Sequence, residues 1–359
     1  MRVLLSVVVG CVALQVGTTR PAAIAASPDT QSLIRVMAVV TDRLGRPLTG
    51  LKPADFDVLV DGQPQALDSV ELAGAGPATP RTLAFLLDEF HVAAEHSAVV
   101  RDSLLRFVDQ SLRPGDLAVV VKPLDSLTTI TPTADRDEVR SAISTFEGRK
   151  GDYTPRTVFE RNYMAQAPNA IEWARAQIVT SALRALGMSL SDKSHSRPAI
   201  VLVSDGFARM RSSREVPANL QTAIRILNRA NAPVYAYAPA LTAQSDDATQ
   251  AVDPAFAALT ALTTQTGGDL VVGTSALETG LARMARDLDA HYVLTYHAAH
   301  GSDGRFHALQ VGIKRQGAQV RARTGYVAPI SEAMRAAARP APSAPLRMLR
   351  RSTLIQSWS

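Results

Sequence analysis

Residues 81–90 have the sequence RTLAFLLDEF, a short apolar run that ends in two adjacent carboxylates. The uncharged segment 82–87 predicts a strand that is buried on both faces of a parallel sheet. Open α/β sheets bind their ligands outside the carboxyl ends of the strands. Asp88 and Glu89 are therefore expected at the ligand-binding edge of such a sheet.

A second stretch has the same design, because residues 199–206, AIVLVSDG, form an apolar run that ends at Asp205. Strand and helix patterns alternate through the chain around these two stretches. The further strands are expected at 117–121, 127–131, 234–237 and 269–272, and the helices at 97–112, 136–146, 170–189, 215–230, 254–265 and 277–288. Residues 148–168 are expected to form a long loop. The alternation predicts an α/β domain over residues 81–289 with a doubly wound, mostly parallel sheet.

Both flanks of this domain have strand patterns without helices. Residues 33–75 alternate apolar and polar positions around a hairpin signal at Asp61-Gly62, and residues 290–328 alternate in the same way. The first flank alone is too short to be a stable unit. We therefore expect the two flanks to pack together as one small β-sandwich beside the α/β domain.

The N-terminus is typical of a secretory signal peptide. Arg2 precedes the apolar run 3–16, and Ala23-Ile-Ala25 provides a small-residue cleavage site, so residues 1–25 are assigned to the signal. The expected location is secreted or periplasmic, with no membrane span after the signal. Lipid attachment at Cys11, which is the single cysteine, is the alternative, but the apolar run continues beyond it through Leu14.

Positive charge is concentrated at the two ends of the chain. The formal net charge is +5, yet residues 330–359 carry five arginines and one glutamate, and residues 1–25 carry two arginines. The body between them has a net charge of about −1, so no nucleic-acid partner is expected. The tail, residues 329–359, is rich in Ala, Pro and Arg and is predicted to be disordered.

Several fragments in this order carry a family resemblance. Residues 51–64 (LKPADFDVLVDGQP) are similar to a leading β module, and the stretches 113–120, 203–206, 292–296 and 320–326 follow in the order expected of the family. The α/β part resembles a von Willebrand factor A domain. Residues 33–328 as a whole resemble the VWFA-related proteins of acidobacteria.

The resemblance implies a metal-ion-dependent adhesion site for a divalent cation, Mg²⁺ or Mn²⁺. The family pattern is D-x-S-x-S after the first strand, a loop threonine, and an aspartate after the fourth strand. Asp88 and Asp205 match the two aspartates, and Thr154 or Thr157 would supply the threonine. Phe90 and Val92 stand where the serines belong and cannot coordinate a metal, so the site is degenerate.

Two interpretations of these acids remain open. In the first, the chain is an adhesion-type module that binds a protein ligand at the edge that bears Asp88 and Asp205, through an altered metal site. In the second, Asp88 caps a helix or turn, Asp205 sits in a Ser-Asp-Gly turn, and the chain is a metal-independent scaffold that binds through its β module or basic tail.

Enzymatic activity is the remote third alternative, and the chain is predicted not to be an enzyme. It has no dinucleotide-binding glycine motif after residues 82–87, no phosphate-binding loop with its lysine, and no G-x-S-x-G nucleophile elbow. Four histidines, His291, His297, His300 and His307, have no recognised metal-binding spacing and are expected to be exposed hairpin residues.

Overall fold

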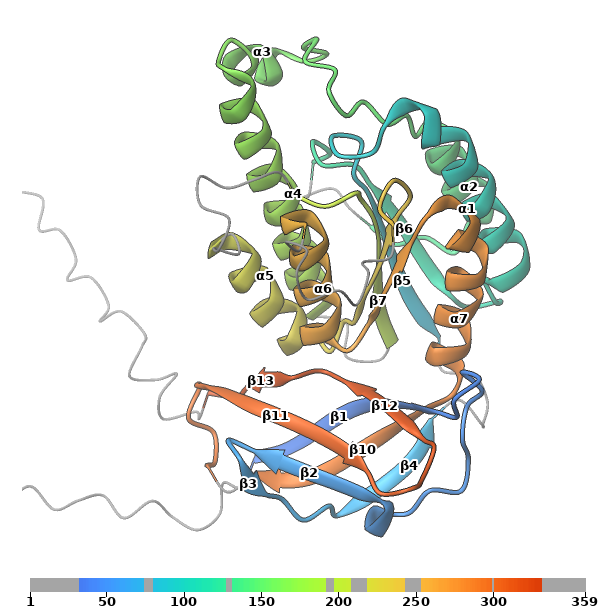
Figure 1. The fold of residues 1–359 in the computed structure, drawn as a ribbon, viewed down its shortest axis with the longest axis vertical. Helices are drawn as coiled ribbons and strands as arrows, with labels where there is room; N and C mark the ends of the chain where they lie inside the picture. The colour runs from blue at the N-terminus through green and yellow to red at the C-terminus, as the bar shows by residue number, and fades with distance from the viewer. Residues whose placement is uncertain are drawn as a thin grey trace, which may run out of the picture.

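The computed structural model describes residues 32–73, 80–126, 131–191, 197–207, 218–242, 253–298 and 300–330 (Figure 1). The predicted signal peptide 1–25, most of the predicted strand 127–131 and nearly all of the tail 329–359 lie outside the described residues. In the described part, no helix is long and apolar enough to cross a membrane.

Five parallel strands form the central sheet of the chain. They are β5 (Arg81–Leu87), β6 (Leu117–Val121), β7 (Arg197–Val203), β8 (Val234–Ala238) and β9 (Asp269–Val272), in the spatial order β6-β5-β7-β8-β9. Every neighbouring pair is parallel. The fold class is therefore α/β, as the alternating strand and helix patterns predict.

Helices cover both faces of this sheet (Figure 1). One face packs against α1 (Ser97–Ser111), α2 (Arg136–Ser144) and α7 (Leu277–Asp289), and the other against α4 (Pro168–Ser191), α5 (Ala218–Arg229) and α6 (Pro254–Thr266). A hydrophobic core lies on each face of the sheet, and successive residues of β5 point into opposite cores. Phe85 packs in the core on the α1 side, and Leu86 packs in the core on the α4 side. All seven residues of β5 are buried, because the strand is covered on both faces.

Strands from the two flanks of the chain form two antiparallel sheets. The first has the order β12-β1-β10-β4 and the second the order β13-β11-β2-β3. Their bounds are β1 Ser32–Thr41, β2 Phe56–Val60, β3 Gln63–Pro64, β4 Ser69–Ala73, β10 His291–Ala298, β11 Phe306–Ile313, β12 Gln319–Ala322 and β13 Gly325–Val327. Residues of both sheets share one hydrophobic core, which includes Val36, Val58, Leu294 and Leu309.

The antiparallel sheets lie at the amino ends of the parallel strands (Figure 1). Arg321 pairs with Asp287 of α7 at 2.5 Å, and the guanidinium of Arg323 donates to the carbonyl oxygen of Asn228 at 2.6 Å. The carboxyl ends of the parallel strands therefore face away from the antiparallel sheets.

The predicted loop 148–168 is wrong over part of its length, because it contains α3 (Val158–Met164). Thr157 accepts a hydrogen bond from the N–H of Glu160, and the Glu160 carboxylate accepts one from the N–H of Thr157. This reciprocal capping box starts a helix that the apolar pattern is too short to reveal. Pro168, expected to close the loop, is the first residue of α4, a position that proline favours.

Candidate functional site at the carboxyl edge of the parallel sheet

Asp88 and Asp205 lie at the same edge of the parallel sheet. The strands that precede them, β5 and β7, are direct neighbours, with Leu87 opposite Val203. The strand order reverses between these two strands, since β6 lies on one side of β5 while β7, β8 and β9 follow on the other. Such a switch point is where open α/β sheets place their ligand sites.

The Asp88 carboxylate is fully buried and accepts three hydrogen bonds. Its Oδ2 atom accepts from the Ser204 hydroxyl at 2.6 Å and lies 2.7 Å from Nδ1 of His91, and its Oδ1 atom accepts from the N–H of Phe90 at 3.2 Å. Asp88 thus holds the turn after β5 and ties it to β7. It does not cap α1, which begins nine residues later at Ser97.

Phe90 and Val92, which the resemblance aligns with the serines of the family pattern, are fully buried. The guanidinium groups of Arg149 and Arg175 lie 4.8 and 5.0 Å from the centroid of the Phe90 ring. Both arginines are buried, and Arg149 forms ion pairs with Glu89 at 3.1 Å and with Glu160. Two fixed cations therefore lie against the aromatic ring of Phe90.

Asp205 is buried and only partly satisfied. Its Oδ1 atom accepts from the N–H of Ala240 at 2.6 Å, while Oδ2 has no hydrogen-bond partner among the described residues. Burial raises the pKa of Asp205 above its ordinary value, and the Asp88 charge adds to this, although the Ala240 N–H, Lys150 and His96 oppose the shift.

Thr154 and Thr157 lie in the segment after α2. Thr154 is exposed, and its N–H donates to the side chain of Asp152 at 2.9 Å within its own loop. Thr157 is occupied as the N-cap of α3. Among the described hydrogen bonds, none joins either threonine to Asp88 or Asp205.

This set of donors does not suit Mg²⁺ or Mn²⁺. Mg²⁺ requires about six oxygen ligands in near-octahedral positions, and Mn²⁺ also prefers oxygen donors. Asp88 already accepts three hydrogen bonds, Phe90 and Val92 have no ligand atoms in their side chains, and of these residues and Asp205 only Asp205 has a side-chain oxygen without a hydrogen bond. With two guanidinium groups beside Phe90, the chemistry of the edge favours a buried ionic network over an open cation site.

An apolar groove lies beside this edge, between α3 and α4. It has a volume of about 380 Å³. Its lining residues are Pro123, Leu124, Phe159, Gln177, Ile178, Ser181 and Ala182, and we refer to it as the α4 groove. Phe159 and Trp173 are 56% and 53% exposed, and Trp173 lies one helical turn before Gln177 on the same side of α4. The sequence gives no signal for this surface, because residues 158–164 of α3 lie in a segment whose pattern predicts a loop.

The prediction that the four histidines are exposed hairpin residues is wrong for two of them, and a third is only half exposed. His291 and His307 are buried, at 4% and 6% exposure, His300 is half-buried, and His297 is exposed. Strand pairing brings His307 against Asp61, which is remote in the sequence, with 2.7 Å between Nδ1 and Oδ2. The alternation of polar and apolar residues along one strand does not indicate which distant residue will lie beside it.

The chain matches no protein-family model, and no curated protein is significantly similar to it. Among solved structures, proximal thread matrix protein 1 from the mussel byssus is 11% identical over 59% of this chain and 48% of its own, with a TM-score of 0.35. The human COPII-coat protein Sec24c is 10% identical over 81% of this chain and 48% of its own, with a TM-score of 0.31. The chain thus spans about half of each structure, and the α/β assignment rests on the strand order described above.

Proposed function

We propose that the protein is a secreted or periplasmic protein-binding module of the von Willebrand factor A-like type that recognises its partner without a divalent metal. The observation that carries this proposal is the composition of the carboxyl edge. Hydrogen bonds use both oxygens of the Asp88 carboxylate, and Phe90, flanked by Arg149 and Arg175, fills the place of a coordinating side chain.

The α4 groove is the surface that we assign to the partner. Phe159 and Trp173 expose large apolar side chains beside it, and aromatic residues are enriched at the centres of protein interfaces. The groove lies next to the switch-point edge and away from the antiparallel sheets, so a partner can reach it. We expect the partner to insert an apolar side chain or short segment.

Chemical cross-linking and capture from an extract of the source cells tests both parts of the proposal. The wild-type chain should capture the same proteins in EDTA as in millimolar Mg²⁺. Substitution of both exposed aromatics, Phe159→Asp in the lining of the α4 groove and Trp173→Asp beside it, should abolish capture. Met188→Asp is the matched control, because Met188 is equally exposed on the same helix but lies more than one helical turn beyond the last residue of α4 that lines the groove.

Two outcomes would contradict this function. Capture that requires Mg²⁺ and is lost in EDTA would restore the metal-dependent adhesion site. Capture that survives both groove substitutions would move the contact surface elsewhere, to the antiparallel sheets or the basic tail.

A further inference from the structure

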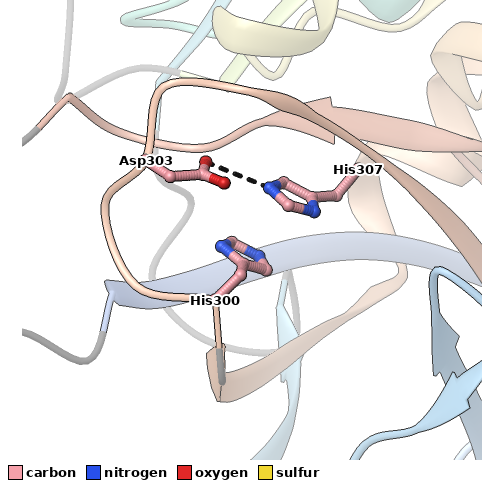
Figure 2. Close-up of side chains that lie close together, drawn as sticks. All are labelled: His300, Asp303 and His307. Atoms are coloured by element: carbon pink, nitrogen blue, oxygen red, sulfur yellow. Dashed lines mark hydrogen bonds and ion pairs between the residues drawn. The ribbon is translucent and has the colours of Figure 1, made fainter.

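A second cluster of ligating side chains lies in the antiparallel part of the molecule, far from the carboxyl edge of the parallel sheet. Figure 2 shows His300 and Asp303 on the connection between β10 and β11, with His307 on β11 beside them. One ligand atom from each residue lies within 4.8 Å of the other two. In the described part of the chain, this is the only group of three or more His, Cys, Asp or Glu side chains that meets this criterion.

The nitrogen atoms of His307 both face carboxylates. Nδ1 lies 2.7 Å from Oδ2 of Asp61, and Nε2 lies 3.1 Å from Oδ1 of Asp303. A neutral imidazole has a single N–H, so donation to Asp61 leaves the lone pair of Nε2 facing a second acceptor. A positive charge between Nε2 and the Asp303 carboxylate, either a proton or a metal ion, removes this repulsion.

Asp61 is held in place for this contact. Its backbone φ of 49° is in the left-handed region, and its Oδ1 atom accepts from the N–H of Ala308 at 2.9 Å. A carboxylate that fixes the remote nitrogen of a histidine is the usual outer partner of a metal-binding imidazole. Asp61 therefore orients His307 so that Nε2 points towards Asp303.

His300 completes the cluster from the opposite side. Its ring is stacked on that of His307, with the centroids 3.5 Å apart and the planes at 5°. Its nitrogens lie 2.8 Å from the Gly301 carbonyl oxygen and 2.6 Å from the Tyr326 hydroxyl. Since a metal lies in the plane of each imidazole that binds it, His300 must rotate out of the stack and exchange one of these partners for the ion.

We propose that His300, Asp303 and His307 bind a divalent transition-metal ion of the zinc class, with Asp61 as the outer partner of His307. Two imidazoles and one carboxylate are the donor types that Zn²⁺ favours, whereas Mg²⁺ and Ca²⁺ prefer oxygen ligands alone. Three protein ligands leave a fourth position for water or a group from another molecule. His300 follows a strand of the first antiparallel sheet and His307 belongs to the second, so the ion would link the two sheets.

Calorimetric titration of the untagged chain with Zn²⁺ tests the site directly. We expect one ion per chain and a higher melting temperature with Zn²⁺ than with Mg²⁺. His300→Ala and Asp303→Asn should each weaken binding at least about tenfold, and Asp61→Asn about 10- to 100-fold as an outer-partner substitution. His297→Ala is the matched control, because His297 forms its own pair with Asp68, at 2.7 Å, away from the cluster.

A second measurement needs no substitution and therefore does not depend on the variants folding. Diethyl pyrocarbonate modifies accessible histidines, and mass spectrometry locates the product. Zn²⁺ should protect His300, which is half-buried, and leave the exposed His297 reactive. Equal modification of His300 with and without Zn²⁺, no heat at 1 mM Zn²⁺, or unchanged affinity in folded His300→Ala would each overturn the proposal.

Discussion

Substitution of Asp88 by alanine distinguishes a structural carboxylate from a metal ligand. The carboxylate is fully buried and accepts hydrogen bonds from Ser204 and Phe90, with His91 as its third partner. Its removal leaves these donors without an acceptor in the core, and each unsatisfied buried group costs about 1–3 kcal/mol. With three hydrogen bonds lost, the total cost is at least about 3 kcal/mol.

We therefore expect Asp88→Ala to lower the free energy of unfolding by about 3–5 kcal/mol. At roughly 2–4 °C per kcal/mol for a domain of about 150–250 residues, the melting temperature should fall by about 6–20 °C. The loss should be the same in EDTA and in Mg²⁺, because the stabilisation comes from protein hydrogen bonds. Thermal unfolding monitored by circular dichroism in both buffers measures it.

Two controls accompany this measurement. Asp125→Ala removes an exposed acid that follows β6 at the same end of the sheet, and it should change the melting temperature far less. Ser204→Ala should cost less than Asp88→Ala, and the double variant should lose less than the sum of the two, because both substitutions remove the same hydrogen bond. An Asp88→Ala variant as stable as wild type in EDTA, but less stable in Mg²⁺, would refute the structural role.

Two further predictions concern buried carboxylates with opposite pKa shifts. Burial alone would raise the pKa of Asp116, but the hydrogen bonds from Arg81 and Arg113 outweigh it and lower the pKa. This stabilisation is present above the ordinary pKa of 3.8 and is lost as the pH falls through the folded-state value. The deficit in melting temperature of Asp116→Asn should therefore shrink as the pH is lowered from 7 to 3, and a constant deficit would contradict the assignment. For Asp205, burial raises the pKa, so its contribution is present in acid and is lost as the pH rises through the folded-state value. The melting temperature of Asp205→Asn should be higher than that of the wild type at pH 7 and equal to it near pH 3. A variant with a lower melting temperature than the wild type at pH 7 would show that the free oxygen has a stabilising partner.

The sequence was sufficient for the α/β class and for the place of the two aspartates. The apolar runs before Asp88 and Asp205 are long, uncharged and end in an acid, and the structure pairs exactly these strands. Helical periodicity was equally clear from residue 97 to residue 111. These features depend on local patterns, which can be identified in a single sequence without knowledge of the tertiary contacts.

What surrounds the aspartates could not be predicted in the same way. Arg149 reaches the Phe90 ring from the segment before α3 and Arg175 reaches it from α4, and no periodicity in the sequence indicates that they meet there. The capping box at Thr157 and Glu160 was visible in the sequence, but it is a short signal inside a polar segment. Burial of His307 depends on strand pairing between residues that are far apart, such as Gln310 with Leu59.

The interleaved pairing of β1 with β10 and β12 has a consequence for how the chain folds. The two strands that pair with β1 are both synthesised after the whole parallel sheet, and Ala38 lies opposite Tyr292 of β10 and Ala322 of β12. During synthesis β1, β2 and β4 therefore keep unpaired strand edges until the ribosome has passed residue 290, after which β10 begins. Expression of a fragment that stops before that point should therefore yield an aggregation-prone product, even when its α/β part has already folded.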